Sequence, residues 1–250
     1  NYNFTWSKTL VNGIEGQEND IFNRSTNKFL SNLDRPLVSN ININYTAPAP
    51  GWAKNKLMKY ILSDWTTGAL LTYSSGTPIL VPLSTNNLNT SYFFPTASYM
   101  NRNPGVPLFL QDLNCHCFDP KTTFVLNPAA WADPLPGQFS SSTAYYGDYR
   151  QQRQPTEAMN FGRNFKISER VTAQARVEFT NIFNRSFLPA PSVGFVPVNT
   201  ASTLQTAGGR YIAGFGTFGN LRNAGALAGG GNLGLGTSQR TGQLVVRFSF

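Results

Sequence analysis

One cluster of cysteine and histidine side chains is the first place to look for metal chemistry in this chain. Cys115, His116 and Cys117 are consecutive, and they include both cysteines and the sole histidine. A structural metal site needs three or four ligands in tetrahedral geometry, and no second Cys/His pair exists to complete one. Asp112 and Asp119 could add oxygen ligands, so the cluster is only a weak metal candidate. The sequence favours a disulfide in an oxidising compartment, although one intervening residue is tight for its geometry.

The same histidine would have to serve any Ser-His-Asp chemistry. It lies in a segment rich in proline and asparagine, without a Gly-x-Ser-x-Gly elbow nearby. The 12 acidic residues are scattered and form no pair suited to acid–base work. We therefore expect no enzymatic activity and assign no catalytic residue.

Two glycine-rich stretches match the dinucleotide fingerprint Gly-x-Gly-x-x-Gly, at residues 214–219 and 229–234. Nucleotide binding requires a buried strand before the glycines and a helix after them, whose amino end meets the pyrophosphate. Here more glycines follow, and then a strand-like segment. In a chain with 22 glycines such matches arise freely, so we expect an extracellular loop and no cofactor.

The net charge of +8 is thinly spread and forms no long basic tract. The small basic groups are Lys54, Lys56 and Lys59, and Arg150, Arg153 and Arg163. We expect such charges on loops, on turns or facing a lumen, and we expect no nucleic-acid partner.

The composition of the chain indicates the class of fold to which these candidate residues belong. Charged residues make up 13% of the chain, against roughly 25% in soluble domains. Aromatic residues also make up 13%, and there are 26 asparagines. No apolar run approaches the length of a transmembrane helix. This combination fits a barrel with an apolar, aromatic outer surface and a wet, polar interior, and it fits a secreted all-β protein nearly as well.

Six segments alternate apolar and polar side chains over about the length of a membrane-spanning strand. They are residues 2–10, 37–45, 65–74, 158–168, 171–184 and 241–250. The clearest is 37–45, in which Ile41, Ile43 and Tyr45 alternate with Asn40, Asn42 and Asn44. Arg163 falls on the apolar side of its segment, and the pattern offers no reason for it.

The last segment carries the strongest signal. Leu244, Val246, Phe248 and Phe250 share one face of an alternating strand that stops on an aromatic residue. A terminal apolar edge strand invites pairing with other chains, whereas a closed barrel in a bilayer removes that edge. The segment therefore favours an outer-membrane barrel whose outer surface contacts lipid.

The connections alternate in length. With the last residue on the periplasmic side, a tight turn at 168–170 is periplasmic, and the long links 185–240 and 76–157 are extracellular. The link 11–36 is also outside, and the periplasmic link 46–64 is expected to hold a short helix at about residues 53–62. Long outer loops and short inner turns are typical of such barrels.

We therefore predict an all-β fold, an antiparallel meander that forms about the last six strands of a transmembrane barrel. Residues 1–250 would be the carboxy-terminal part of one barrel domain, because no signal peptide is visible at Asn1. The side chains expected to face the lumen are Asn40, Asn42, Asn44, Gln174, Arg176, Glu178 and Arg247. The aromatic residues of the longest loop either grip an extracellular ligand or form the loop's own core, and the core is favoured; they are Tyr92, Phe93, Phe94, Tyr99, Tyr145, Tyr146 and Tyr149.

Three segments together resemble the end of a TonB-dependent outer-membrane receptor, most closely the Oar-like group with its carboxypeptidase-regulatory-like domain. They are residues 161–167 (FGRNFKI), 177–185 (VEFTNIFNR) and 246–250 (VRFSF). Shorter matches to earlier barrel strands of that group are residues 6–8, 34–36, 65–68 and 74–78.

The resemblance implies a 22-stranded barrel with an amino-terminal plug and a TonB box. Neither plug nor box matches anything in this sequence. It also implies that Phe250, with Phe248, is the signal read by the barrel-assembly machinery. The implied setting is the outer membrane of a Gram-negative bacterium, with lipid, the assembly machinery and the TonB system as partners.

The implied activity is TonB-powered uptake of a scarce or bulky ligand of unknown identity. One alternative is a surface adhesin or export-associated barrel with the same architecture. A second is a soluble, secreted β-sandwich that binds carbohydrate.

Overall fold

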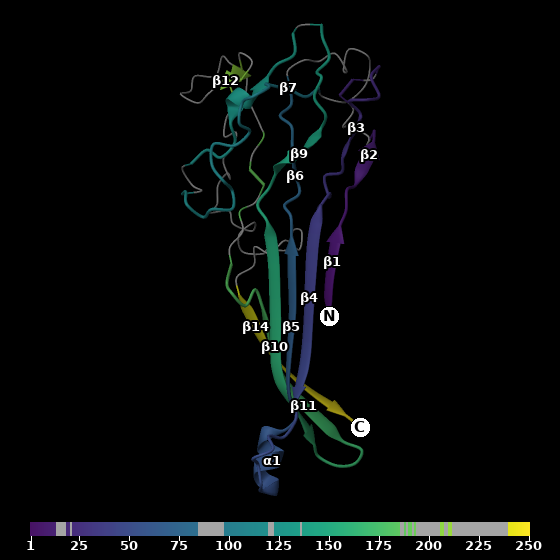
Figure 1. The fold of residues 1–250 in the computed structure, drawn as a ribbon, viewed down its shortest axis with the longest axis vertical. Helices are drawn as coiled ribbons and strands as arrows, with labels where there is room; N and C mark the ends of the chain where they lie inside the picture. Colours follow the sequence, from purple (N-terminus) through teal and green to yellow (C-terminus); the bar gives the residue numbers. More distant parts are fainter. Residues whose placement is uncertain are drawn as a thin grey trace.

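The computed structural model describes residues 1–13, 19–20, 22–84, 98–119, 123–135, 137–185, 188, 190–191, 193, 206–207, 210–211 and 240–250. Its main feature is one antiparallel sheet in the strand order β1-β4-β5-β10-β11-β14 (Figure 1). The strands are β1 (Tyr2–Trp6), β4 (Leu37–Ala47), β5 (Trp65–Ser74), β10 (Gln154–Lys166), β11 (Thr172–Thr180) and β14 (Thr241–Ser249). Each predicted segment overlaps one of these strands, and the predicted antiparallel meander is confirmed.

The strand ends differ from the prediction for local reasons. β1 stops at Trp6 because the backbone N–H of Thr9 donates to the Asp34 carboxylate, 2.6 Å away, instead of to a neighbouring strand. β11 stops at Thr180 because Asn181 and Asn184 have φ angles of 49° and 50°, in the left-handed region that ends a strand. At the opposite end of β11, the tight turn at 168–170 is closed by hydrogen bonds from the N–H groups of residues 167 and 168 to the carbonyl of Val171.

The register divides the sheet into an apolar face and a polar face. Ile41 pairs with Leu71, and Ile43 pairs with Ala69, so these side chains share one face. The same face continues through the pairing of Phe161 with Val177. It also contains Leu244, Val246 and Phe248 on β14. The alternation read from the sequence therefore places most of the large apolar residues of the six strands on one side.

This apolar face has no protein packed against most of it. Tyr2 is 66% exposed, Leu244 is 71% exposed and Phe248 is 56% exposed. A continuous apolar surface of this kind indicates contact with another protein or with a membrane. β1 and β14 are edge strands among the described residues, so the sheet does not close there.

The hydrophobic core lies beyond the strands, in the described parts of residues 7–36 and 75–153, here called the cap. Its small paired strands are β2 (Leu10–Asn12) with β3 (Lys28–Leu30), β6 (Pro78–Leu80) with β9 (Tyr145–Arg150), and β7 (Asn101–Arg102) with β8 (Trp131–Ala132), beside the short 3-10 helix η1 (Pro128–Ala130). Core side chains include Val81, Met100, Trp131 and Tyr149, and none comes from the six long strands. β12 (Thr206–Ala207) and β13 (Arg210–Tyr211) form a further short pair.

The cap supports the expectation that the longest loop forms a core of its own. The link 76–157 carries β6 to β9 and most of the core. Tyr99, Tyr145 and Tyr149 are buried there, and Tyr146 packs against the same cluster, as expected of a loop with its own core. Tyr92, Phe93 and Phe94 lie outside the described residues, as do both glycine-rich stretches.

A helix occupies the link 46–64, which was predicted to be periplasmic, at the opposite end of the sheet (Figure 1). It is α1 (Lys56–Leu62), which begins three residues later than predicted. Within the described chain, no helix has the length and apolarity required to cross a bilayer.

Candidate functional site

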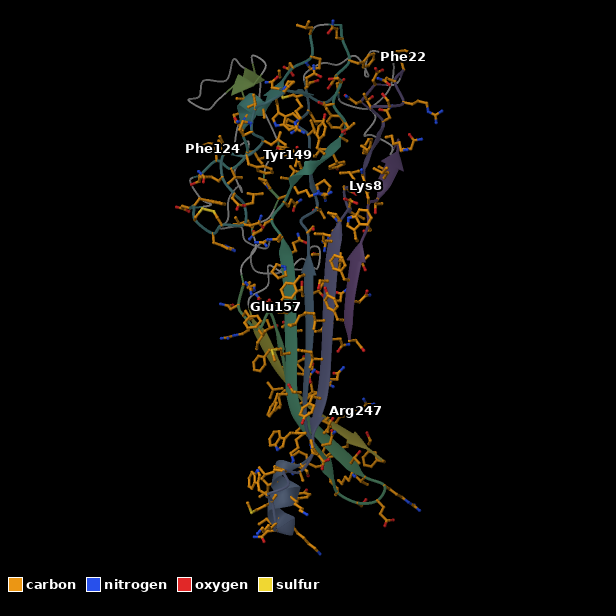
Figure 2. The ribbon with its side chains drawn as sticks, in the orientation of Figure 1. Lys8, Phe22, Phe124, Tyr149, Glu157 and Arg247 are labelled. Atoms are coloured by element: carbon orange, nitrogen blue, oxygen red, sulfur yellow. A yellow bond between two sulfur atoms is a disulfide. The ribbon has the colours of Figure 1, made fainter. Side chains whose placement is uncertain are left out.

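The polar face of the six-stranded sheet is the main candidate for function. It contains all seven side chains predicted to face a lumen: Asn40, Asn42, Asn44, Gln174, Arg176, Glu178 and Arg247. Figure 2 shows Arg247 near the helix-bearing end of the strands and Glu157 nearer the cap. That the polar face lines a lumen stays a prediction, because the described strands do not close.

One row of side chains crosses five strands on this face. Asn44 on β4 is the partner of Gly68 on β5, which is the partner of Asn160 on β10. Asn160 pairs in turn with Glu178 on β11, and Glu178 with Gln243 on β14. Amide and carboxylate groups therefore lie side by side across most of the sheet, as neighbouring strands bring directly opposed side chains into contact.

Two glycines make room for these side chains. A Cβ atom at Gly68 would lie 2.7 Å from Nδ2 of Asn160 and 3.1 Å from Oδ1 of Asn44. A Cβ atom at Gly162 would lie 2.4 Å from the Cβ of Arg176 and 2.7 Å from the carbonyl oxygen of Ala175. Glycine is required at position 162 because a neighbouring strand approaches closely there.

One ion pair lies on the polar face, between Arg176 and Glu178. Nε of Arg176 lies 2.6 Å from Oε1 of Glu178, and Nε2 of Gln243 donates a hydrogen bond to the other carboxylate oxygen of Glu178. Nearer the cap, the hydroxyl of Thr72 donates to Oδ1 of Asn40 at 2.8 Å. This surface offers many neutral donors and acceptors, which suits contact with water or with a polar solute.

A second polar cluster lies where the strands meet the cap, on the apolar side of the sheet. Glu157 is 1% exposed, and its carboxylate accepts a hydrogen bond from Arg185 at 2.9 Å and one from the Tyr73 hydroxyl at 3.0 Å. The bond to Glu157 is the main reason that the pKa of Arg185 is raised. The hydrogen bonds from Arg185 and Tyr73 explain how the acidic side chain of Glu157 is tolerated on the apolar face.

The same region holds a pocket of about 650 Å³ lined by Phe4, Tyr73, His116, Arg153, Phe183 and Arg185, among others. Phe4 and Tyr73 belong to the apolar face. The pocket is therefore separate from the polar row.

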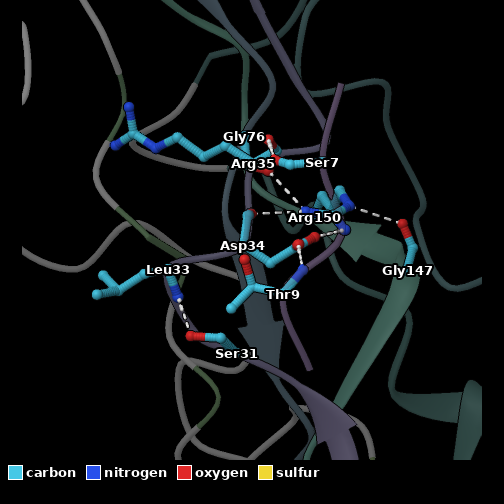
Figure 3. Close-up of polar contacts among 9 residues, drawn as sticks. All are labelled: Ser7, Thr9, Ser31, Leu33, Asp34, Arg35, Gly76, Gly147 and Arg150. Atoms are coloured by element: carbon cyan, nitrogen blue, oxygen red, sulfur yellow. Dashed lines mark hydrogen bonds and ion pairs between the residues drawn. The ribbon is translucent and has the colours of Figure 1, made fainter. Parts of the chain in front are cut away.

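An ion-pair network joins two loops of the cap to each other beside the end of the sheet (Figure 3). Nη2 of Arg150 lies 2.6 Å from the carboxylate of Asp34, which is 1% exposed. Arg150 also donates to the backbone carbonyls of Asp34, Gly76 and Gly147 at 2.9, 3.2 and 2.8 Å. Sequence reasoning missed this network, because its two charged residues lie far apart in the chain and show no local pattern.

Arg163, which had no explanation in the sequence, is held by aromatic rings. Its guanidinium carbon lies 4.8 Å from the ring centre of Phe165, 5.2 Å from Tyr60 on α1 and 5.5 Å from Trp65. Trp65 also stacks on Phe161, with ring centres 5.0 Å apart. Cation–π contacts of this kind stabilise a cation over aromatic faces. Sequence could not show this, because Tyr60 comes from a different segment.

Cys115 and Cys117 form a disulfide in the cap, with Cα atoms 5.1 Å apart. The disulfide interpretation is confirmed, and it leaves neither sulfur as a thiolate ligand. His116 between them has a φ of 51° and lines the pocket of about 650 Å³. Nowhere in the described chain do three His, Cys, Asp or Glu side chains gather in a way that could hold a metal ion.

Comparison with known families decides the class of protein. Residues 1–225 match the family model described as "Outer membrane beta barrel domain". The chain belongs to this family. No curated protein and no solved structure matches the chain.

Membership assigns the domain to the outer membrane. The apolar face of the sheet is then the surface suited to lipid, and the cap is the extracellular layer, since such barrels have long outer loops and short inner turns. The alternative of a soluble, secreted β-sandwich is wrong, because the family is a membrane barrel and a single sheet exposes its apolar face.

Proposed function

We propose that this outer-membrane barrel domain belongs to a TonB-dependent receptor that takes up a scarce or bulky ligand. The observation that carries the proposal is the polar row from Asn44 to Gln243, which crosses five strands opposite the apolar face. In a closed barrel a row at this position lines the interior, and a solute that passes through meets amide and carboxylate groups. The setting we propose is a Gram-negative bacterium.

The TonB-dependent assignment is supported by the three segments that resemble that group. Residues 161–167, 177–185 and 246–250 fall on or beside β10, β11 and β14, which are adjacent in the sheet. The resemblance therefore concerns one contiguous patch of the barrel wall. Energy for uptake would be relayed from the inner membrane by TonB, and the protein has no catalytic role in this proposal.

The test measures uptake by cells that produce the full-length protein. The probes are a radiolabelled ferric hydroxamate siderophore, a maltodextrin and an oligopeptide, each with and without a proton uncoupler. We expect one probe to accumulate only in energised cells. We also expect Asn44→Trp to lower that accumulation several-fold, because the ring projects into the polar row.

Ile43→Trp is the matched control, since its side chain lies on the apolar face, one residue away. Equal uptake by both tryptophan variants would contradict a pathway along the polar face. Accumulation that is insensitive to the uncoupler would contradict the role of TonB.

A second candidate is a surface adhesin or export-associated barrel. The observation that favours it is the folded cap, which has a hydrophobic core. The cap also contains buried hydrogen bonds, such as the one that the backbone N–H of Tyr99 donates to Oδ1 of Asn19 at 3.0 Å. A folded outer layer of this kind suits binding at the cell surface. Probe binding to intact cells that is unchanged by the uncoupler, without internal accumulation, would favour this function over uptake.

A further inference from the structure

Arg163 and helix α1 form an unusual basic and apolar surface at the periplasmic end of the domain. Arg163 lies on the apolar face, directly opposite Trp65 on one neighbouring strand and Ala175 on the other. Tyr60 of α1 covers its guanidinium, and the indole N–H of Trp65 donates to the carbonyl of Ile61 at 3.0 Å. The helix is therefore held against the lipid-facing side of the sheet.

The guanidinium of Arg163 has no anionic partner within the described residues. The residue is only 8% exposed, and its Nε atom is buried without a hydrogen-bond acceptor. Its aromatic neighbours stabilise the cation through their rings, but ring faces cannot accept the in-plane hydrogen bonds of a guanidinium as an anion does. A buried charge of this kind is costly unless an anion completes its surroundings.

Helix α1 is amphipathic in a way that fits a membrane surface. With 3.6 residues per turn, Leu57, Met58 and Ile61 share one side, and Lys56, Lys59 and Tyr60 share the other. Leu57 is 69% exposed and Ile61 is 48% exposed, and α1 has no buried residue. A short helix with an apolar side and a lysine-bearing side lies in the interface between lipid tails and headgroups.

We propose that α1 and Arg163 form a binding site for the phosphate of an anionic phospholipid in the periplasmic leaflet. The apolar side of α1 enters the boundary of the acyl chains, and the guanidinium of Arg163 donates to the phosphate, assisted by Lys56 and Lys59. Guanidinium groups bind phosphate through paired, charge-assisted hydrogen bonds. The position at the end of the apolar face, continuous with the lipid-facing surface, is what makes a lipid the occupant.

This inference rests on the orientation of the sheet in the membrane and not on the proposed uptake. An uptake experiment can fail while the lipid site stands, because neither α1 nor Arg163 belongs to the polar row. The reverse also holds, so the two tests report on different surfaces.

The experiment uses the full-length protein reconstituted in nanodiscs of phosphatidylethanolamine with phosphatidylglycerol as the minor component. Native mass spectrometry after release into detergent counts the lipids that stay bound. We expect phosphatidylglycerol to be enriched several-fold over its share of the bilayer. Arg163→Gln should abolish that enrichment, and Lys56→Ser with Lys59→Ser should reduce it.

The matched control is Arg170→Gln, which removes one positive charge from the exposed 168–170 turn at the same end of the sheet. It should leave the enrichment unchanged. Heat-modifiable migration on gels checks that each variant is folded, and Leu57→Ser with Ile61→Ser offers a second test that leaves Arg163 in place. These helix changes should also weaken lipid retention.

Several results would overturn the proposal. Equal binding of phosphatidylethanolamine and phosphatidylglycerol would show that the headgroup charge is not recognised. Equal enrichment in Arg163→Gln and in the unchanged protein would remove the role of the guanidinium. Displacement of the bound lipid by inorganic phosphate would show a site for free anions instead.

Discussion

Arg150 binds Asp34 twice, through the carboxylate and through the backbone carbonyl, although the two residues are 116 positions apart in the chain. Asp34 lies near the end of the link between β1 and β4, and Arg150 lies near the end of the link between β5 and β10. Their contact fixes two outer loops to each other at the end of the strands. The cap is therefore one folded layer that is built from separate loops.

Asp34→Ala should destabilise the cap and leave the six-stranded sheet folded. It leaves the Arg150 guanidinium, whose side chain is 17% exposed, without its carboxylate, a loss that costs about 3–5 kcal/mol for a buried pair. The measurement is protease cleavage of the cap on intact cells, which should become much faster. Asp148→Ala is the control, because the ion pair of Asp148 with Arg102 has the same 2.6 Å separation but is exposed to solvent. Loss of this exposed pair should cost under about 1 kcal/mol. Equal cleavage rates in both variants would contradict this view.

Gly162→Ala should destabilise the sheet by about 1–3 kcal/mol, the usual cost of an added methyl group in a tightly packed position. Its Cβ would press on the backbone of β11, which cannot move aside as a flexible side chain can. Urea unfolding of the full-length protein in detergent measures the change. Gly51→Ala, whose Cβ would meet nothing within 4 Å, serves as the comparison, and similar unfolding midpoints would show that the close approach is unimportant.

Spin labels should distinguish the two faces of the sheet. Labels at Ile43, Val177 and Val246 are expected to be accessible to oxygen and shielded from a water-soluble nickel complex, because lipid covers the apolar face. Labels at Asn44 and Gln174 should show the opposite preference. The measurement uses the intact protein in native membranes, and nickel accessibility at the first three positions would refute the assignment of the lipid-facing side.

The cap should weaken at high pH through Tyr149. Burial raises the pKa of its phenol above the usual value, while its contact with Trp131 opposes this less strongly. The folded cap therefore favours the neutral phenol, and this contribution to stability is complete below the pKa of an unfolded tyrosine, about 10. It is lost as the pH rises further, by about 1.4 kcal/mol per pH unit.

Tyr149→Phe removes the ionisable group and should flatten that decline. Near-ultraviolet circular dichroism of the full-length protein, recorded during thermal melts at increasing pH, gives the comparison. If the melting temperature of the cap falls with pH equally in the variant and in the unchanged protein, another group is responsible.

Deletion of Phe250 from the full-length protein should lower its level in the outer membrane, because we expect the assembly machinery to read this aromatic residue. Phe250 is 95% exposed, so its loss removes no packing within the chain. Quantitative blotting of membrane fractions measures the level. The control is Ser249→Ala, a substitution of the neighbouring residue that keeps the Phe250 ring. Normal assembly without Phe250 would rule out this role.

Period-two alternation was sufficient to find all six strands and the face on which each side chain lies. β5 has the predicted bounds, since nothing in residues 65–74 interrupts the pattern. β10 starts four residues earlier than predicted, because Pro155 and Glu157 occupy apolar-face positions and hide the alternation. Asn44 and Glu178 of the polar row were among the side chains predicted to face a lumen, but the continuity of the row across five strands depends on a register that sequence does not contain.

Contacts between distant segments could not be predicted. The core of the cap combines residues from Phe29 to Tyr149, and irregular loops give no periodicity that marks such residues as buried. Arg163 looked misplaced because its partner Tyr60 lies on a helix about a hundred positions earlier in the chain. In both places the decisive information is spatial proximity.

The core of the cap takes no side chain from the six strands, and this separation has an evolutionary consequence. Bacteriophages and antibodies meet only the outermost layer of such a protein. Substitutions in the cap can accumulate under selection by phages and antibodies, while the six strands of the sheet keep their hydrogen-bonded pairing. The same barrel strands can therefore carry caps with many different outer surfaces in the course of evolution.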